Sequence, residues 1–94
     1  MPAYIISQVH MRPGPGLDNY RRLAADSIEC HGGKYLVRGG DTDVLEGEWS
    51  GAVIVVEFPS AEQARAWYES DDYAEALKFR DDALTRNLIL VEGV

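Results

Sequence analysis

The sequence has a single cysteine, Cys30, and only two histidines among its 94 residues. A lone cysteine excludes a disulfide framework and the paired ligand spacing of a structural zinc site. No His-x-x-x-His pair, no carboxylate cluster at metal-ligand spacing and no Gly-x-Ser-x-Gly nucleophile turn occurs. We therefore expect no metal site and no tightly bound cofactor.

Basic charge and long apolar runs are also scarce. Nine Lys and Arg residues stand against sixteen Asp and Glu residues, which gives a formal net charge of −7. This charge argues against a nucleic-acid phosphate backbone or an anionic membrane surface as a partner. No segment approaches the roughly 20 apolar residues of a membrane span, and the N-terminal residues lack the basic region of a signal peptide. A cytoplasmic location is the default expectation.

The length of the chain predicts one domain, residues 1–94. A chain of this size buries only roughly 60–70% of the surface that its unfolded form exposes. Yet 46% of its residues are hydrophobic, including five Tyr and two Trp. Because apolar surface in excess of a small core is commonly covered by another subunit, we expect a partner.

Strand and helix patterns alternate along the chain. Alternating or β-branched apolar segments predict four strands, at residues 3–11, 34–38, 52–58 and 87–91. Apolar residues at three- and four-residue steps predict a first helix over residues 17–31, with Pro15 suited to open it. Gly32 and Gly33 supply the left-handed stop of that helix.

A second helical region follows the third strand. It begins with a capping box, Ser60 with Gln63 three residues later. After an interruption, Asp72 followed by Glu75 predicts a second cap, which opens a further helix to about Leu84.

The order strand, helix, strand, strand, helix, strand predicts an α+β fold. The simplest arrangement is a four-stranded antiparallel sheet of ferredoxin-like βαββαβ topology with the helices on one face. The strands are apolar on both sides, whereas helices cover only one face of the sheet. We therefore expect the open face to pack against the sheet of a second copy, in a homodimer.

Several motifs, in order along the chain, carry a resemblance to a known family. They are His31-Gly-Gly-Lys-Tyr-Leu-Val-Arg-Gly-Gly40, Leu45-Glu-Gly-Glu-Trp49, Val56-Glu-Phe-Pro-Ser60, Ala66-Trp-Tyr68, Asp72-Tyr73, Leu77-Lys-Phe-Arg80 and Val91-Glu-Gly93. With these motifs the chain resembles domain-of-unknown-function family 1330, of the dimeric α+β barrel superfamily. The resemblance implies the ferredoxin-like fold, the homodimer and a pocket between the sheet and its helices. It implies no particular activity, since superfamily relatives include cofactor-free monooxygenases, haem-processing enzymes and small-ligand isomerases or lyases.

Arg80 is the candidate that the helical pattern singles out. It falls on an apolar stripe at steps of four, three and four residues: Tyr73, Leu77, Arg80 and Leu84. A guanidinium in a partly apolar pocket suits fork-like binding of a carboxylate or enolate. The aromatic side chains expected to share that space are Trp67, Tyr68 and Tyr73. The alternative is structural, an ion pair between Arg80 and an internal acid such as Glu46 or Glu57.

The two histidines and a further charged pair are the remaining candidates. His31 ends the stripe of the first helix, and because histidine is the usual acid–base residue near neutral pH it suits a proton shuttle. Alternatively, it caps the last carbonyls of that helix. His10, on the first strand, either helps to line the pocket or is solvated. Arg38 and Glu46 flank a glycine turn, and they either pair with each other or bind substrate.

Two hypotheses follow for function. The first is a cofactor-independent enzyme acting on a small carboxylate- or enol-bearing metabolite, with Arg80 as anchor and His31 or His10 as proton shuttle. The second is a non-catalytic homodimeric module that binds a small ligand or serves as a scaffold. An interior packed shut around an internally neutralised Arg80 would exclude the enzyme.

Overall fold

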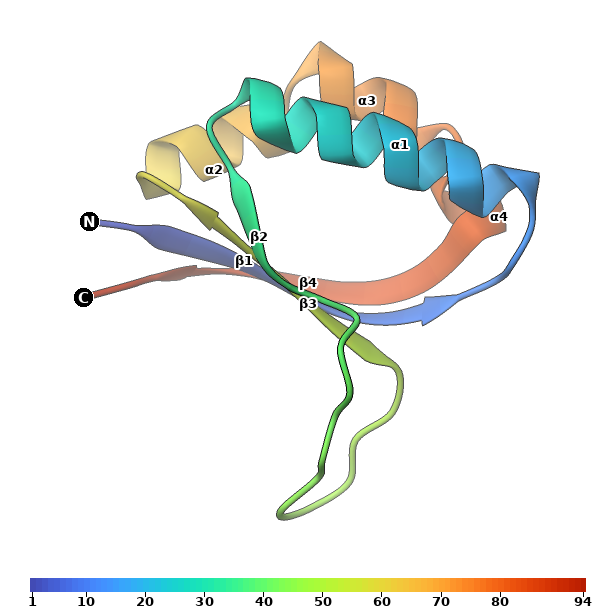
Figure 1. The fold of residues 1–94 in the computed structure, drawn as a ribbon. Coiled ribbons are helices and arrows are strands. Elements are labelled where there is room, and N and C mark those ends of the chain that lie inside the picture. Colours follow the sequence, from blue (N-terminus) through green and yellow to red (C-terminus); the bar gives the residue numbers. More distant parts are fainter.

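The structure is a computed structural model that describes all residues, 1–94. Its elements follow in the order β1 (Ala3–Met11), α1 (Pro15–Cys30), β2 (Lys34–Arg38), β3 (Ala52–Phe58), α2 (Ala61–Tyr68), α3 (Asp71–Leu77), α4 (Arg80–Ala83) and β4 (Leu84–Glu92). The strands form one antiparallel sheet in the order β2-β3-β1-β4, and the helices cover one of its faces (Figure 1). The predicted ferredoxin-like α+β fold is confirmed.

The predicted stop and start signals of the first two helices are confirmed. Pro15 is the first residue of α1, where its missing N–H leaves no hydrogen bond unmade. Beyond the end of α1, Gly32 takes a left-handed backbone conformation with φ 79°. Ser60 caps α2, because its hydroxyl accepts a hydrogen bond from the backbone N–H of Gln63 at 3.2 Å.

The cap of α3 differs from the prediction. Ser70, not Asp72, precedes the helix, and its hydroxyl accepts from the backbone N–H of Tyr73 at 3.1 Å. Asp72 instead lies inside the first turn, where its charge faces the positive end of the helix dipole. Both residues suit a helix start, but only the residue with extended backbone just before the first turn can reach the free N–H groups.

The extent of the last helix was also predicted wrongly. α3 ends at Leu77, and its last turn is tightened by a bond from the N–H of Phe79 to a carbonyl three residues back. The short helix α4 follows, and the chain enters β4 at Leu84 rather than at Asn87. One continuous helix to Leu84 therefore does not form.

The core lies between the sheet and the helices. Trp67 of α2 is its centre, because its ring stacks on that of Tyr73 at 4.2 Å between centroids and on that of Phe58 at 5.6 Å. The indole N–H of Trp67 donates to the hydroxyl of Ser27 on α1 at 2.9 Å. These contacts join α1, α2, α3 and β3, and they hold the helix layer on the sheet.

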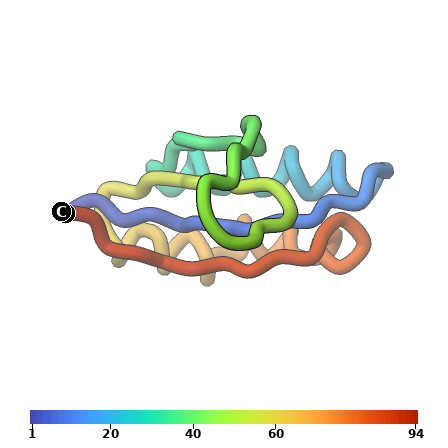
Figure 2. The backbone as a smooth tube through the Cα atoms, turned by 90° about the horizontal axis from the view of Figure 1, so that it is seen from below, coloured from blue at the N-terminus to red at the C-terminus, as the bar shows by residue number.

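The face of the sheet without helices carries an apolar row that crosses all four strands. Its members are neighbours in register: Val37, Val55, Ile6 and Ile89. Val37 and Ile89, at the two edges, are 38% and 55% exposed. The loop of residues 39–51 between β2 and β3 projects on this side, away from the helices (Figure 1), and lies below the middle of the sheet (Figure 2).

Candidate functional site

Arg86 stands on the face of β4 that is turned toward the helices. Strand alternation places it in line with three partly or fully buried leucines: Leu84, Leu88 and Leu90. A charged side chain in an apolar row of a strand needs polar partners in the interior, because a buried charge without them costs several kcal/mol or more.

Two buried phenols provide these partners. Nη1 of Arg86 donates to the hydroxyl of Tyr20 on α1 at 2.6 Å, and Nη2 donates to the hydroxyl of Tyr73 on α3. The two hydroxyl oxygens are 2.7 Å apart. The guanidinium carbon also lies 5.8 Å and 5.7 Å from the centroids of the two rings. We call these three residues the Arg86 site.

No acid neutralises Arg86. The ion pairs of the chain are Lys78 with Glu75 at 2.8 Å and Arg80 with Asp81 at 3.5 Å. Arginines in protein interiors are almost always paired with an anion. The phenols supply hydrogen-bond acceptors but no negative charge, so the site keeps a net positive charge.

The pKa values of the site favour its protonated state. Burial raises the pKa of Tyr20 well above the ordinary value for a tyrosine, and the nearby Tyr73 raises it further, whereas Arg86 lowers it by less. Burial lowers the pKa of Arg86, but the two tyrosines raise it by more, so it lies above its ordinary value. At neutral pH the site therefore holds a charged Arg86 guanidinium and a protonated Tyr20 phenol.

The Arg86 site has more hydrogen-bond donors than acceptors. Both phenol oxygens accept from Arg86, and only one of the two hydroxyl hydrogens is used in the bond between Tyr20 and Tyr73. The second hydroxyl hydrogen and the remaining N–H groups of Arg86 have no acceptor in the chain. A site with free donors and positive charge suits an oxyanion.

Arg86 opens onto a cleft at the edge of the sheet that β4 forms. This β4-edge cleft has a volume of about 340 Å³ and is lined by Arg12, Tyr68, Arg80, Asp81, Leu84, Thr85, Arg86 and Leu88. Small-molecule pockets run from about 300 to 1,000 Å³, so the cleft has room for a small metabolite. It contains three arginines and one acid, in a chain of net charge −7.

Arg12 builds a wall of this cleft. Its side chain donates to four groups, the backbone carbonyls of Asp81, Asp82 and Leu84 and the hydroxyl of Thr85. These bonds tie the loop after β1 to the junction of α4 and β4. Because most of its five N–H donors are used, Arg12 contributes charge and shape rather than free hydrogen bonds.

Arg80 also reaches the cleft, but in a setting other than the predicted one. Its side chain is 39% exposed, and its Nε lies 3.5 Å from a carboxylate oxygen of Asp81. The apolar stripe expected around Arg80 does not form, since Leu84 belongs to a strand. Pairing of Arg80 with Glu46 or Glu57 was predicted wrongly as well.

The three predicted aromatic residues contact one another, but they lie at different depths. Tyr73 is fully buried and belongs to the Arg86 site. Tyr68 is 43% exposed, lines the β4-edge cleft, and its ring centroid is 5.9 Å from that of Tyr73. Trp67 lies deeper and lines an interior cavity of about 50 Å³ between α1 and the sheet, of which Arg86 is also a wall.

The other predicted residues lie outside the β4-edge cleft. His31 caps α1, with Nδ1 2.8 Å from a carbonyl one turn back in the helix. His10 is exposed on the helix-free face of β1, and Glu46 is exposed in the loop 39–51. Arg38 stacks on Tyr35, with 4.3 Å from the guanidinium carbon to the ring centroid. It makes no ion pair with Glu46, so that predicted pair was wrong.

Arg86 and Tyr20 are not among the residues predicted from the sequence. The last strand was predicted to begin at Asn87, which leaves Arg86 outside any pattern. If the strand begins at Leu84, its alternation places Arg86 at an inward position between leucines. This pattern is the sequence signal that would have identified Arg86. Tyr20 lies on the predicted buried stripe of the first helix, where nothing distinguishes it from a core residue.

The structure has neither a cluster of metal-ligating side chains nor a membrane-spanning helix. No three His, Cys, Asp or Glu side chains come together as a metal ion would require. None of the helices combines the length and the hydrophobicity that crossing a bilayer demands. The Arg86 site and its cleft therefore stand as the candidate functional site.

Comparison with known proteins yields a family match and several similar folds. The model of DUF1330, a domain of unknown function, matches residues 2–94. A protein of unknown function from Rhodopseudomonas palustris is 25% identical, with a TM-score of 0.75 over 99% of this chain and 82% of that one. No protein with a curated description matches.

Two further solved structures share the fold at lower identity. SnoaB, a cofactor-independent oxygenase from Streptomyces nogalater, is 10% identical, with a TM-score of 0.69 over 99% of this chain and 93% of that one. A dimeric ferredoxin-like protein of unknown function from Jannaschia sp. CCS1 is 8% identical, with a TM-score of 0.69 over 99% of this chain and all of that one, 100%. At these identities the similarity concerns the fold alone.

Proposed function

We propose that this chain, which belongs to the DUF1330 family of domains of unknown function, binds a small carboxylate- or enol-bearing metabolite in the β4-edge cleft. Arg86 holds the anionic group, and Arg80 and Tyr68 line the way to it. The observation that carries the proposal is that the side chain of Arg86 donates hydrogen bonds to two phenols and has no acidic partner. A bound oxyanion supplies the missing negative charge and accepts hydrogen bonds from the free donors.

Stabilisation of an anion is also a catalytic device. Arg86 and the free phenol hydrogen are held in place before a ligand arrives, so they stabilise an enolate more than its neutral enol. A bound enol then loses its hydroxyl proton to water in the open cleft more readily than a free one. We extend the proposal to a cofactor-independent enzyme that uses this enolate. SnoaB, of similar fold, is described as a cofactor-independent oxygenase, which supports such chemistry on this scaffold.

A non-catalytic binding module is the second candidate. It is favoured by the absence of a histidine and of any buried carboxylate from the residues that line the cleft. Without such a base, water in the cleft is the acceptor left for a proton removed from carbon. A role for His31 or His10 as proton shuttle stays a prediction, and both residues lie away from the cleft.

We also infer that the chain forms a homodimer through its helix-free sheet faces. The row from Val37 to Ile89 supports this inference, because an uncovered apolar stripe across a whole sheet normally has a partner. The dimeric state named for the Jannaschia protein supports it too.

Binding is tested by isothermal titration calorimetry with a panel of small monocarboxylates and α-keto acids. Wild-type protein is compared with Arg86→Gln and with Arg22→Gln, which removes the same charge from an exposed position on α1. We expect saturable binding to the wild type and to Arg22→Gln. Arg86→Gln should bind at least about tenfold more weakly, because a hydrogen bond to a charged group contributes roughly 1.5–3 kcal/mol. Equal binding by Arg86→Gln would refute the proposal.

Catalysis is tested separately, on the compounds that bind. Enolate formation from a bound α-keto acid exchanges the hydrogens next to the carbonyl for deuterium, which NMR in D₂O follows directly. Exchange faster with the wild type than with Arg86→Gln supports the enzyme. Binding without faster exchange assigns the chain to the non-catalytic module.

A further inference from the structure

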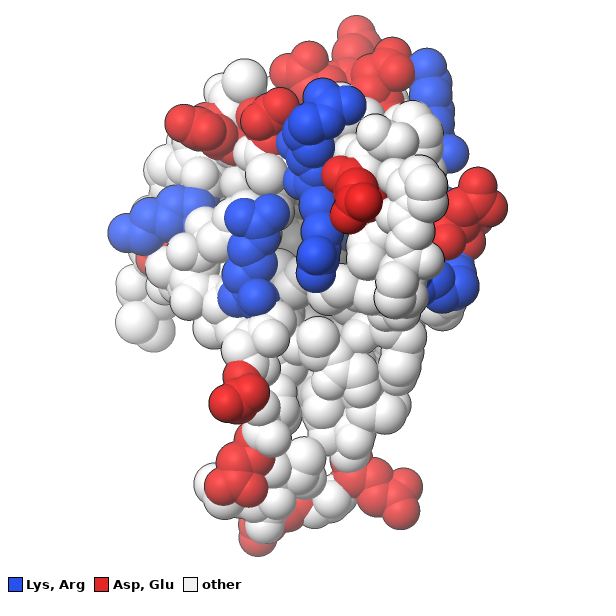
Figure 3. All heavy atoms as spheres, turned by 45° about the vertical axis from the view of Figure 1, so that its right-hand side comes forward, with Lys and Arg blue, Asp and Glu red and all other residues white.

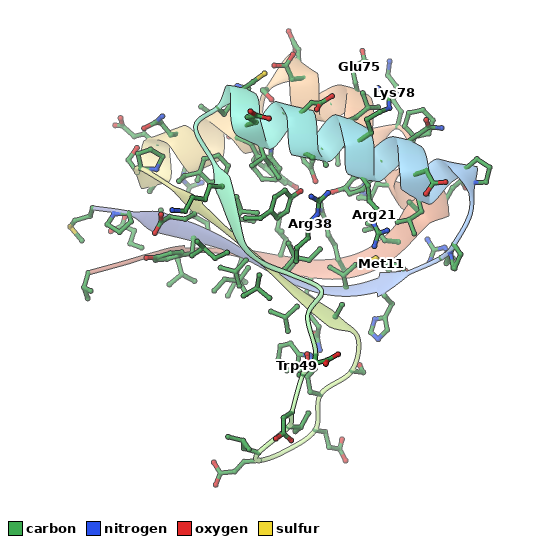
Figure 4. The ribbon with its side chains drawn as sticks, in the orientation of Figure 1. Met11, Arg21, Arg38, Trp49, Glu75 and Lys78 are labelled. Atoms are coloured by element: carbon green, nitrogen blue, oxygen red, sulfur yellow. The ribbon has the colours of Figure 1, made fainter.

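The opposite edge of the sheet, formed by β2, carries a second group of basic side chains. Arg21 of α1 and Arg38 of β2 are both exposed at the edge where the helix layer meets the sheet, and Arg21 points toward Met11 (Figure 4). On the surface nearby, Lys and Arg side chains gather in the middle of the face. Acidic side chains lie along the helices above them and on the loop below, and one acidic side chain lies beside the central basic group (Figure 3). Basic side chains therefore predominate here, in a chain whose net charge is −7.

Neither arginine has an acidic partner. Nη2 of Arg21 lies 3.2 Å from the sulfur of Met11, which is a weak acceptor. The guanidinium of Arg38 lies over the ring of Tyr35 at 4.3 Å. Two unpaired guanidinium groups that face one space repel each other. An anion between them is attracted by both and also removes their repulsion.

Tyr35 adds a third donor. It is half-buried, and its hydroxyl has no hydrogen-bond partner in the chain. Burial raises the pKa of Tyr35, Arg38 and Arg21 lower it, and the net shift is upward. The phenol is therefore protonated at neutral pH and offers its hydrogen.

All three residues line one cavity of about 50 Å³. The remaining walls are Met11, Leu17, Tyr20, Ala24, Ile54 and Leu84, so no carboxylate faces this space. At roughly 10–15 Å³ for each water molecule, it holds about four of them. This is enough for a carboxylate group with a short apolar stem.

We propose that Arg21, Tyr35 and Arg38 form a second anion-binding site, the β2-edge site, which takes the carboxylate of a small organic acid. The flat guanidinium forks match the flat carboxylate, and the Tyr35 hydroxyl donates to one of its oxygens. The apolar walls receive the carbon next to the carboxylate. The site adjoins the Arg86 site, since Tyr20 is a wall of both, but its two arginines lie at the opposite edge of the sheet from Arg86, with β2 and β4 three strands apart in the order β2-β3-β1-β4.

The test follows the side-chain Nε–H signals of the arginines by NMR while sodium acetate is added at constant ionic strength. We expect the Arg21 and Arg38 signals to move together and to saturate. Arg38→Gln should weaken acetate binding, read from the Arg21 signal, at least tenfold. Tyr35→Phe keeps the ring under Arg38 and should weaken binding several-fold. In Arg86→Gln the Arg21 and Arg38 signals should still move together and saturate with acetate, which distinguishes this site from the first.

Three results would overturn the proposal. Shifts that grow linearly and equal those caused by sodium chloride would mean charge screening alone. An unchanged affinity in Arg38→Gln, or in Arg21→Gln if Arg38→Gln does not fold, would remove the arginines from any site. Saturation by inorganic phosphate at lower concentration than by acetate would contradict the carboxylate class.

Discussion

At the scale of the residue, Tyr73 joins the core to the Arg86 site. Its ring is buried against Trp67, while its hydroxyl accepts from Arg86 and shares a hydrogen with Tyr20. Tyr73→Phe removes both bonds and leaves part of a buried guanidinium unpaired. We expect the free energy of unfolding in urea to fall by about 1–3 kcal/mol.

Tyr68→Phe is the matched control, since its hydroxyl has no partner in the chain and its side chain is 43% exposed. Its effect on stability should stay within about 0.5 kcal/mol. Similar losses in both variants would mean that the hydroxyl of Tyr73 contributes nothing to the fold.

The raised pKa of Tyr20 predicts how stability changes at alkaline pH. Below about pH 10 the phenol is protonated in the folded and the unfolded chain, so it adds no pH dependence. Above that pH the unfolded chain loses the proton while the folded chain keeps it. Stability should therefore fall with rising pH, by at most about 1.4 kcal/mol per pH unit from this residue.

The measurement is urea unfolding between pH 8 and pH 12 on the wild type and on Tyr20→Phe. The variant should show a shallower fall above about pH 10, because it has no proton to lose there. Parallel curves would show that Tyr20 titrates alike in both states.

Whether an arginine points inward at the junction of α4 and β4 depends on where helix becomes strand. Side-chain direction turns by about 100° per residue in a helix and alternates in a strand. The predicted long helix therefore put Arg80 inside, whereas the early start of β4 puts Arg86 there. Tyr73 was found from the sequence because the helix around it does form.

At the scale of the element, the cap of α3 gives a direct test of the corrected boundary. Ser70→Ala removes the hydroxyl that accepts from the N–H of Tyr73, and we expect a loss of about 1 kcal/mol of stability. Asp72→Ala removes only a charge near the helix start, which is typically worth about 0.3–1 kcal/mol. Thermal or urea unfolding that ranks Asp72→Ala as the more damaging change would restore the cap predicted from the sequence.

The first three strands and the first helix follow from local signals alone. Pro15, Gly32 and Pro59 mark their ends, and β-branched runs fill β3. The break between α3 and α4 has no such mark. There the Arg12 side chain binds carbonyls around the end of α4, and this contact comes from residues about seventy positions away. Local patterns carry no information about such a partner.

At the scale of the whole molecule, the helix-free face predicts the assembly. Ile89 lies in the apolar row at 55% exposure, so Ile89→Glu leaves the core intact and places a charge in the proposed interface. We expect sedimentation equilibrium to give a dimer for the wild type and a monomer, or a much weaker dimer, for the variant. Ala74→Glu, on the exposed side of α3, should remain dimeric. A monomeric wild type would refute the face-to-face dimer.

The distribution of charge over the molecule is uneven. A chain of net charge −7 keeps arginines without acidic partners at both edges of one sheet. We infer from this arrangement that both edges take anionic ligands, because unpaired cations in these hollows attract anions.

The most direct measurement is a crystal structure with the tightest-binding carboxylate of the calorimetric panel. We expect the carboxylate in the β4-edge cleft, within hydrogen-bond distance of Arg86. The phenols of Tyr20 and Tyr73 should still accept hydrogen bonds from the guanidinium. A carboxylate bound away from Arg86, with water in the cleft, would contradict the proposal.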